Sequence, residues 1–200
     1  MKDEINAKYS EFYKTRNSLH VYPVEFVVRA YLGTYPDLRL SKTEFAGKTI
    51  LDLGFGDGRN MPLLANLGMQ VSGVEISDEI CNQTKERMRK YGIDVDTRVG
   101  RNNGIPFPNA TFDHLLACHS CYYIDKDTSF NDNLKEIARV LKPSGIFVFS
   151  VPIDTSYIFK NAKDLGRGHM QIAADPYGVR NGYVLKAFSN KEEIIESIAP

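Results

Sequence analysis

The chain has 200 residues, of which 42% are hydrophobic and 25% charged, the composition of one globular domain rather than of a disordered segment. Its 25 basic and 25 acidic side chains balance, so no global field draws nucleic acid or an anionic membrane to it. No apolar run approaches the roughly 18 residues of a membrane span, and the first residues have no apolar signal core. The three cysteines, an odd number, are typical of reduced thiols. We therefore expect a cytoplasmic protein with no nucleic-acid partner and no membrane span.

Residues 5–32 carry apolar and aromatic side chains at helical spacing, and the pattern is interrupted around Pro23. Proline disfavours helix at the residue before it but suits a first helical turn. We expect two helices within an N-terminal helical cover of residues 1–44. Two interpretations stay open: the tyrosines can belong to a core at a sheet edge, or they can form a lid in which Tyr9, Tyr13 and Arg16 face a ligand.

Residues 49–60 combine a strand, a glycine loop and a helix start. An apolar strand, Ile50–Leu53, leads into glycines at alternate positions and then into a helix expected over residues 61–67. Such a loop leaves main-chain N–H groups free for a nucleotide-like ligand. The spacing differs from the G-x-G-x-x-G of dinucleotide sites, and Asp52 would repel a pyrophosphate, so a cationic or zwitterionic ligand fits better. The candidate contacts are Asp52, Gly54, Phe55, Gly56 and Gly58.

A second predicted strand, residues 70–76, ends in another acid, Glu75. It follows Gly54 by 21 residues, close to the spacing of about 20 at which an acid reaches ribose hydroxyls in nucleotide-binding sheets. The motif Asp52-Leu53-Gly54-Phe55-Gly56-Asp57-Gly58 resembles the first motif of the class I S-adenosylmethionine-dependent methyltransferases. The resemblance implies that S-adenosylmethionine is the cofactor, that Glu75 binds its ribose and that Ile76 packs against its adenine.

Ser77 can cap a helix over residues 79–91, and residues 94–100 are a third predicted strand. Many members of the family have an acid after this strand, which binds the adenine amino group. Arg101 stands there instead, a departure from the family pattern. Asn102 or Asn103 could replace the acid, because an amide can both accept from the amine and donate to a ring nitrogen. The later segments Ile105-Pro106-Phe107 and Phe112-Asp113 match the family again.

The fourth predicted strand, residues 114–118, ends at the edge where open α/β sheets bind ligands. We expect Cys118 to border the cofactor and His119 to act as general base or to orient the acceptor. A histidine that is merely hydrogen-bonded at the strand end is the alternative. Cys118, His119 and Cys121 also allow a zinc interpretation, but no second ligand pair follows at suitable spacing, so we expect no metal.

The C-terminal third begins with a helix expected over residues 129–141, capped by Asp127 or Thr128. A turn at residues 142–145 then leads to a fifth strand, residues 146–151. Residues 152–188 are rich in glycine and in polar and aromatic side chains, and we expect an insertion that binds the acceptor or forms a lid; an ordinary surface loop is the alternative. Residues 189–200 begin one more helix.

The expected fold is α/β: a single Rossmann-like, doubly wound domain whose mostly parallel sheet has helices on both faces. Residues 45–151 are its cofactor-binding core. Five strands are predicted, and the C-terminal hairpin of the family's usual seven-stranded sheet is absent from this sequence. We expect either a truncated chain or a second chain against the open sheet edge, as in a homodimer.

The function implied by the resemblance is transfer of the S-adenosylmethionine methyl group to a small molecule or a sugar, such as a glycan precursor, by O- or N-methylation. One alternative is a subunit that binds S-adenosylmethionine without catalysis, which the missing adenine acid favours. An NAD(P)-dependent oxidoreductase is the other, and the glycine spacing and Asp52 count against it.

Overall fold

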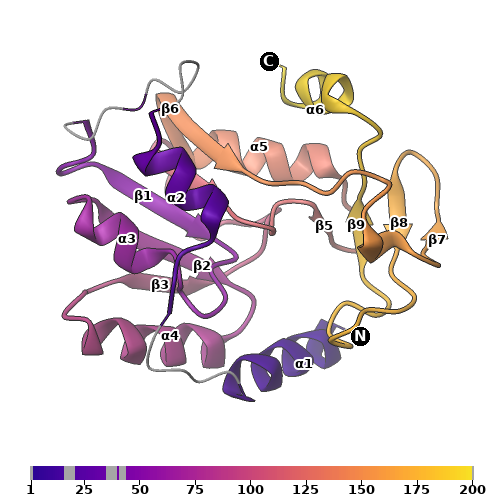
Figure 1. Ribbon diagram of the computed structural model, residues 1–200, viewed down its shortest axis with the longest axis horizontal. Coiled ribbons are helices and arrows are strands. Elements are labelled where there is room, and N and C mark those ends of the chain that lie inside the picture. Colours follow the sequence, from indigo (N-terminus) through magenta and orange to yellow (C-terminus); the bar gives the residue numbers. More distant parts are fainter. Residues whose placement is uncertain (1, 16–20, 35–39, 41–43, 200) are drawn as a thin grey trace.

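The computed structural model describes residues 2–15, 21–34, 40 and 44–199. Its centre is a five-stranded sheet with the strand order β3-β2-β1-β4-β6 (Figure 1). Every pairing in this sheet is parallel. The strands are β1 (Thr49–Leu53), β2 (Gln70–Glu75), β3 (Asp96–Val99), β4 (Phe112–Ala117) and β6 (Leu141–Phe149).

Helices cover both faces of this sheet. They bury the apolar side chains that β1 carries on each face. Ile50 packs into one core together with residues of α2 (Glu25–Leu32), α3 (Met61–Asn66) and α4 (Asp78–Lys90). Leu51 packs into the opposite core with α5 (Phe130–Val140). Successive strand residues point to opposite faces, so Asp52 faces the same side as Ile50. The doubly wound, mostly parallel α/β fold expected from the sequence is confirmed.

A second sheet lies beside the carboxyl ends of the first (Figure 1). It is antiparallel, with the strand order β5-β9-β8-β7. Its strands are β5 (Tyr123–Ile124), β7 (Lys163–Asp164), β8 (His169–Gln171) and β9 (Val184–Lys186), and a short 3-10 helix, η2 (Tyr157–Phe159), precedes them. Because β5 belongs to the loop after β4, residues 152–188 are joined to the core by strand pairing. Residues 152–188 thus contain β7, β8 and β9, and their role as an acceptor-binding insertion or lid stays a prediction.

Two terminal helices complete the described structure. The first, α1 (Lys2–Thr15), runs between α4 and the small sheet (Figure 1). A Ser10–Ser77 hydroxyl contact of 2.9 Å and a Tyr9–Tyr123 hydrogen bond of 3.0 Å fix it. The last, α6 (Lys191–Ile198), buries none of its residues. No helix in the described ranges is both long and apolar enough to cross a membrane.

Two local expectations were wrong. Ser129 caps α5 in a reciprocal capping box with Asp132; Asp127 has a φ of +62°, whereas an N-cap residue is extended. The strand after α5 begins at Leu141 rather than at residue 146. The expected turn at residues 142–145 lies inside β6 as a break in register: Phe112 pairs with Leu141, the next partners are His114 and Ile146, and Ser144 has a φ of +63°.

Candidate functional site

A cavity of about 270 Å³ opens at the carboxyl ends of the central strands. The loops after β1, β2, β3 and β4 form one part of its wall, and α1 and residues 177–183 form the rest. Seven of the residues named from the sequence border it: Gly54, Phe55, Glu75, Ile76, Asn102, Cys118 and His119.

Glu75 is a buried carboxylate in the wall of this cavity. Its Oε1 accepts a hydrogen bond of 3.1 Å from the Gly56 N–H, and its Oε2 accepts one of 2.7 Å from the Ile76 N–H. Burial raises the pKa of Glu75 above its ordinary value, and these two N–H donors oppose the rise. Each oxygen keeps a second lone pair for another donor, so the carboxylate is fixed in place and can still bind a ligand.

The glycines of the loop make room for side chains of the same chain. A Cβ on Gly58 would lie 2.5 Å from Cγ2 of Thr84, and the φ of Gly58 is +72°. A Cβ on Gly56 would collide with the Tyr13 hydroxyl, and one on Gly54 with Ser120. We expected a ligand to approach this main chain, but Gly56 and Gly58 do not border the cavity. Their absent side chains let α1 and α4 close over the loop.

Asp52 lies behind the glycine loop and is 1% exposed. Neither carboxylate oxygen accepts a hydrogen bond from any described residue. Burial, reinforced by the nearby carboxylates of Glu75 and Asp57, raises the pKa of Asp52 to about 8. A cation in the cavity would relieve this concentration of negative charge.

Arg59 enters the cavity wall beside the same carboxylates. Its Nε and Nη2 donate to the two oxygens of Asp57 at 2.9 and 2.6 Å. The sequence motif includes Arg59 but shows no reason to place it at the ligand. The bidentate pair orients the Asp57 carboxylate at the loop.

The segment after β3 differs from the expectation. Arg101 forms an ion pair with Asp125 at 2.9 Å. The Asn102 amide donates to the carbonyl oxygens of Ser120 and Tyr123 at 2.9 and 3.2 Å, so it has no hydrogen left for an adenine nitrogen in this conformation. Its carbonyl oxygen accepts from no described residue. Asn103 does not reach the cavity wall.

His119 lies two residues after the end of β4, has a φ of +58° and borders the cavity. Its main-chain N–H donates to the Ser150 hydroxyl at 2.9 Å, and its Nδ1 lies 2.9 Å from the same oxygen. Burial, followed by the charge of Arg180, lowers the pKa of His119 below its usual value. The ring is therefore neutral at neutral pH. Ser150 could have been anticipated, since β6 ends beside β4 in the parallel sheet.

The cysteines are all free. Burial raises the pKa of Cys118 to about 12, so its thiol in the cavity wall is uncharged. Cys121 is fully buried. Within the described ranges, no cluster of three or more histidine, cysteine or acidic side chains is arranged to hold a metal ion.

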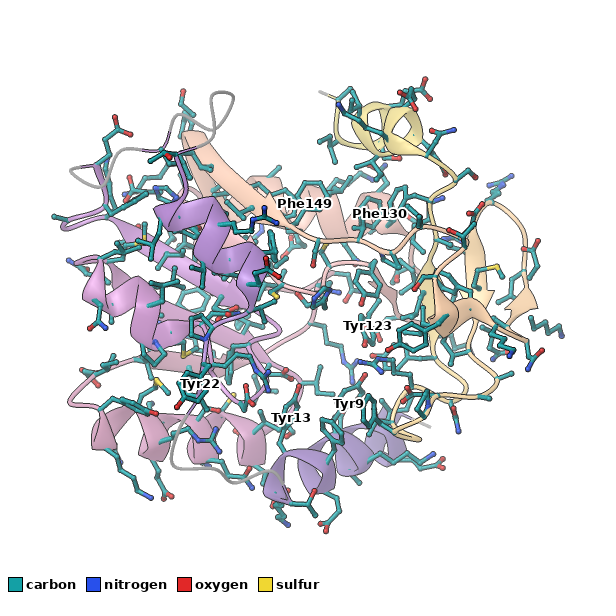
Figure 2. All side chains as sticks on the ribbon, in the orientation of Figure 1. Tyr9, Tyr13, Tyr22, Tyr123, Phe130 and Phe149 are labelled. Carbon is teal, nitrogen blue, oxygen red and sulfur yellow. The ribbon has the colours of Figure 1, made fainter. Side chains whose placement is uncertain are left out.

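Tyrosines close the cavity on the side of α1 and the small sheet. Figure 2 shows Tyr9 and Tyr13 of α1 projecting toward the region in which Tyr123 lies. The Tyr123 hydroxyl accepts hydrogen bonds from Tyr9 at 3.0 Å and from Arg180 Nε at 2.8 Å. Tyr9 and Tyr13 thus occupy the expected lid position, while Arg16 lies outside the described residues. Arg180 lies in the segment 152–188 that the sequence shows to be rich in polar and aromatic side chains, but the sequence does not show its partner.

The comparisons with known proteins agree with this site. The family described as "Methyltransferase domain" matches residues 51–149, the range that holds the glycine loop, Glu75 and His119. These residues, about half of the chain, match a methyltransferase domain, which supports the resemblance to the class I S-adenosylmethionine-dependent methyltransferases.

Two curated relatives are similar to a little over half of this chain. The demethylmenaquinone methyltransferase of Tropheryma whipplei is 31% identical over 103 residues, which cover 52% of this chain and 41% of the relative. The sterol 4-C-methyltransferase of Caenorhabditis elegans is 32% identical over 116 residues, 57% of this chain and 34% of the relative. The matched part of this chain therefore covers well under half the length of each relative.

A solved structure shares the fold. The S-adenosylmethionine-dependent methyltransferase of Methanosarcina mazei superposes with a TM-score of 0.63 at 19% identity, over 82% of each chain. At this identity the similarity concerns the fold alone.

Proposed function

We propose that this chain transfers the methyl group of S-adenosylmethionine to a small-molecule acceptor. The observation that carries the proposal is Glu75: a buried, oriented carboxylate at the end of β2, bordering a cavity beside a glycine loop. The match to a methyltransferase domain supports the cofactor. Because the chain spans only part of its relatives, the activity itself is part of the proposal.

The residues present fit the cofactor. Glu75 would accept hydrogen bonds from both ribose hydroxyls, because each oxygen has a lone pair free. Ile76 would pack against the adenine, and the Asn102 carbonyl oxygen would accept from its amino group. Gly54, Phe55 and Asp57 of the loop and Cys118 would border the amino-acid part. Asp57 would supply negative potential that favours a sulfonium and an ammonium group, and Asp52 would ionise more readily once such a cation is bound.

S-adenosylmethionine supplies an electrophilic methyl group when bound. The protein's part is to align the acceptor and to exclude water. The rings of Tyr9, Phe12 and Tyr13 on α1 cover the cavity and would exclude water from it. His119 is neutral at neutral pH, so it can accept a proton from a hydroxyl or ammonium acceptor at the ring nitrogen that Ser150 does not bind. A cytoplasmic location and a homodimer remain predictions for fractionation and light scattering.

Calorimetry with S-adenosylmethionine and, separately, with NADH tests the proposal. We expect heat of binding only from the sulfonium ligand. Incubation with methyl-labelled S-adenosylmethionine and a panel of small acceptors then tests transfer. Binding of NADH alone, or of neither ligand, would overturn the cofactor assignment. Binding without transfer to any acceptor class would favour a non-catalytic subunit.

A further inference from the structure

The part of the cavity formed by α1, β5 and residues 177–183 is aromatic. Six of its wall residues carry rings: Tyr9, Phe12, Tyr13, Tyr123, Tyr177 and Tyr183. The rings contact one another, with centroids 6.5 Å apart for Tyr9 and Tyr123, 5.7 Å for Phe12 and Tyr177, and 5.1 Å for Tyr123 and Tyr183. This group of rings, which we name the aromatic wall, suits a flat apolar ring better than a sugar.

Hydrogen-bond donors converge on this wall. The Tyr123 oxygen already accepts from Tyr9 and from Arg180 Nε, and no described residue accepts from its own O–H. Arg180 Nη1 donates to Asp175 at 2.9 Å, and its Nη2 has no acceptor within the described ranges. A hydroxyl with both lone pairs engaged can only donate. Tyr123 and Arg180 therefore offer hydrogen bonds to an oxygen of a ligand.

The ion pair between Arg180 and Asp175 indicates which kind of ligand oxygen fits this position. The Asp175 carboxylate is fully buried and also accepts from the N–H groups of Val179 and Arg180. It fixes the guanidinium and compensates its charge. A permanently charged anion is therefore not required, and a neutral or weakly acidic oxygen is favoured. A sugar would instead need acceptors for its several hydroxyl hydrogens.

We propose that the acceptor is a phenol, an aromatic hydroxy compound whose oxygen accepts hydrogen bonds from Tyr123 and Arg180 while its ring packs on the aromatic wall. The inference rests on the proposed function and replaces the glycan precursor as the acceptor class. In the transfer, the phenolic proton passes to the free ring nitrogen of His119. An oxygen lone pair forms the new O–CH₃ bond, the S–CH₃ bond breaks, and its electron pair stays on sulfur.

The test uses 4-nitrophenol as the probe, with protein saturated with S-adenosylhomocysteine. Its ring has one hydroxyl, and its colour reports whether that hydroxyl is ionised. The comparison ligands are 4-nitrobenzyl alcohol, with an aliphatic hydroxyl on the same ring, and methyl glucoside. The variants are Tyr123→Phe and Arg180→Gln. Matched controls are Tyr157→Phe and Arg89→Gln, both at exposed positions outside the cavity wall.

We expect 4-nitrophenol to bind most tightly of the three ligands. Each cavity variant should weaken it roughly tenfold, the size of one hydrogen bond, with the affinity for S-adenosylhomocysteine within about twofold of wild type. Arg180→Gln should also lower the ionised fraction of the bound probe, a change that a merely structural role would not produce. Thermal unfolding identifies a misfolded variant. If one variant is misfolded, the other variant and the ranking of the three ligands by affinity test the proposal.

Tighter binding of methyl glucoside, or unchanged affinity for 4-nitrophenol in both folded variants, would overturn the acceptor class. Those outcomes leave the proposed function intact as long as S-adenosylhomocysteine binds. If it does not bind even to the wild-type protein, the proposed function fails first.

Discussion

Replacing Asp52 with asparagine should stabilise the fold increasingly as pH rises. The folded-state pKa of Asp52 is about 8, raised first by burial and then by its acidic neighbours, whereas the unfolded value is about 4. The folded state therefore binds the proton more tightly than the unfolded state. Its contribution to stability is fully present below about pH 4 and is lost as pH rises toward 8. In the middle of this window the loss approaches about 1.4 kcal/mol per pH unit.

Asparagine has nearly the same shape and does not ionise, so this loss should disappear in the variant. Between pH 5 and 7 the difference in the free energy of unfolding, variant minus wild type, should grow by up to about 3 kcal/mol. Denaturant unfolding at pH 5, 6 and 7, without ligand, measures it. A difference that stays flat or shrinks with pH would show that Asp52 is ionised at low cost and would refute the electrostatic account of the loop.

Three further substitutions test other parts of the structure. Asp113→Asn should lower the free energy of unfolding by roughly 1–3 kcal/mol at pH 7 and by less toward pH 3. Burial alone would raise the pKa of Asp113, but Lys142 at 2.8 Å and Thr49 at 2.9 Å hold it below its usual range; a pH-independent loss in unfolding experiments would contradict this. Gly58→Ala should cost roughly 1–3 kcal/mol, while Gly104→Ala, where a Cβ meets no atom within 4 Å, should stay near wild type in thermal unfolding. With any acceptor found by labelled-methyl transfer, turnover by the wild type should fall below about pH 6.5, where His119 takes up a proton. Turnover by His119→Asn should not show this fall. The same pH profile in both proteins would show that His119 is not the base.

The core of the fold was predictable because its signals are local. The apolar strand Ile50–Leu53, the glycines at 54, 56 and 58, and an acid at the end of the second strand all lie within short segments. Parallel strands bring their carboxyl ends to one edge, so Glu75 and His119 could be assigned to the same cavity before its shape was known.

The acceptor side was not predictable in this way, because its contacts join distant segments. Tyr123 pairs with Leu185 across the small sheet, and its hydroxyl meets Tyr9, 114 positions earlier. Asn102 lies in the cavity wall as expected, but its amide hydrogens bond to main-chain carbonyl oxygens, and the spacing of residues in the sequence does not show these bonds. Residues 152–188 likewise gain their order from a two-residue strand, β5, that has no periodicity of its own.

The contact between Glu75 and the ribose is the central claim, and a double-mutant cycle tests it directly. Wild type and Glu75→Ala are titrated with S-adenosylhomocysteine and with its 2′,3′-dideoxy analogue, with Glu86→Gln, at an exposed position, as the control. The account predicts that wild type prefers the hydroxylated ligand by roughly 2–3 kcal/mol and that this preference falls below about 0.7 kcal/mol in Glu75→Ala. An equal preference in both proteins would show that Glu75 does not bind the ribose.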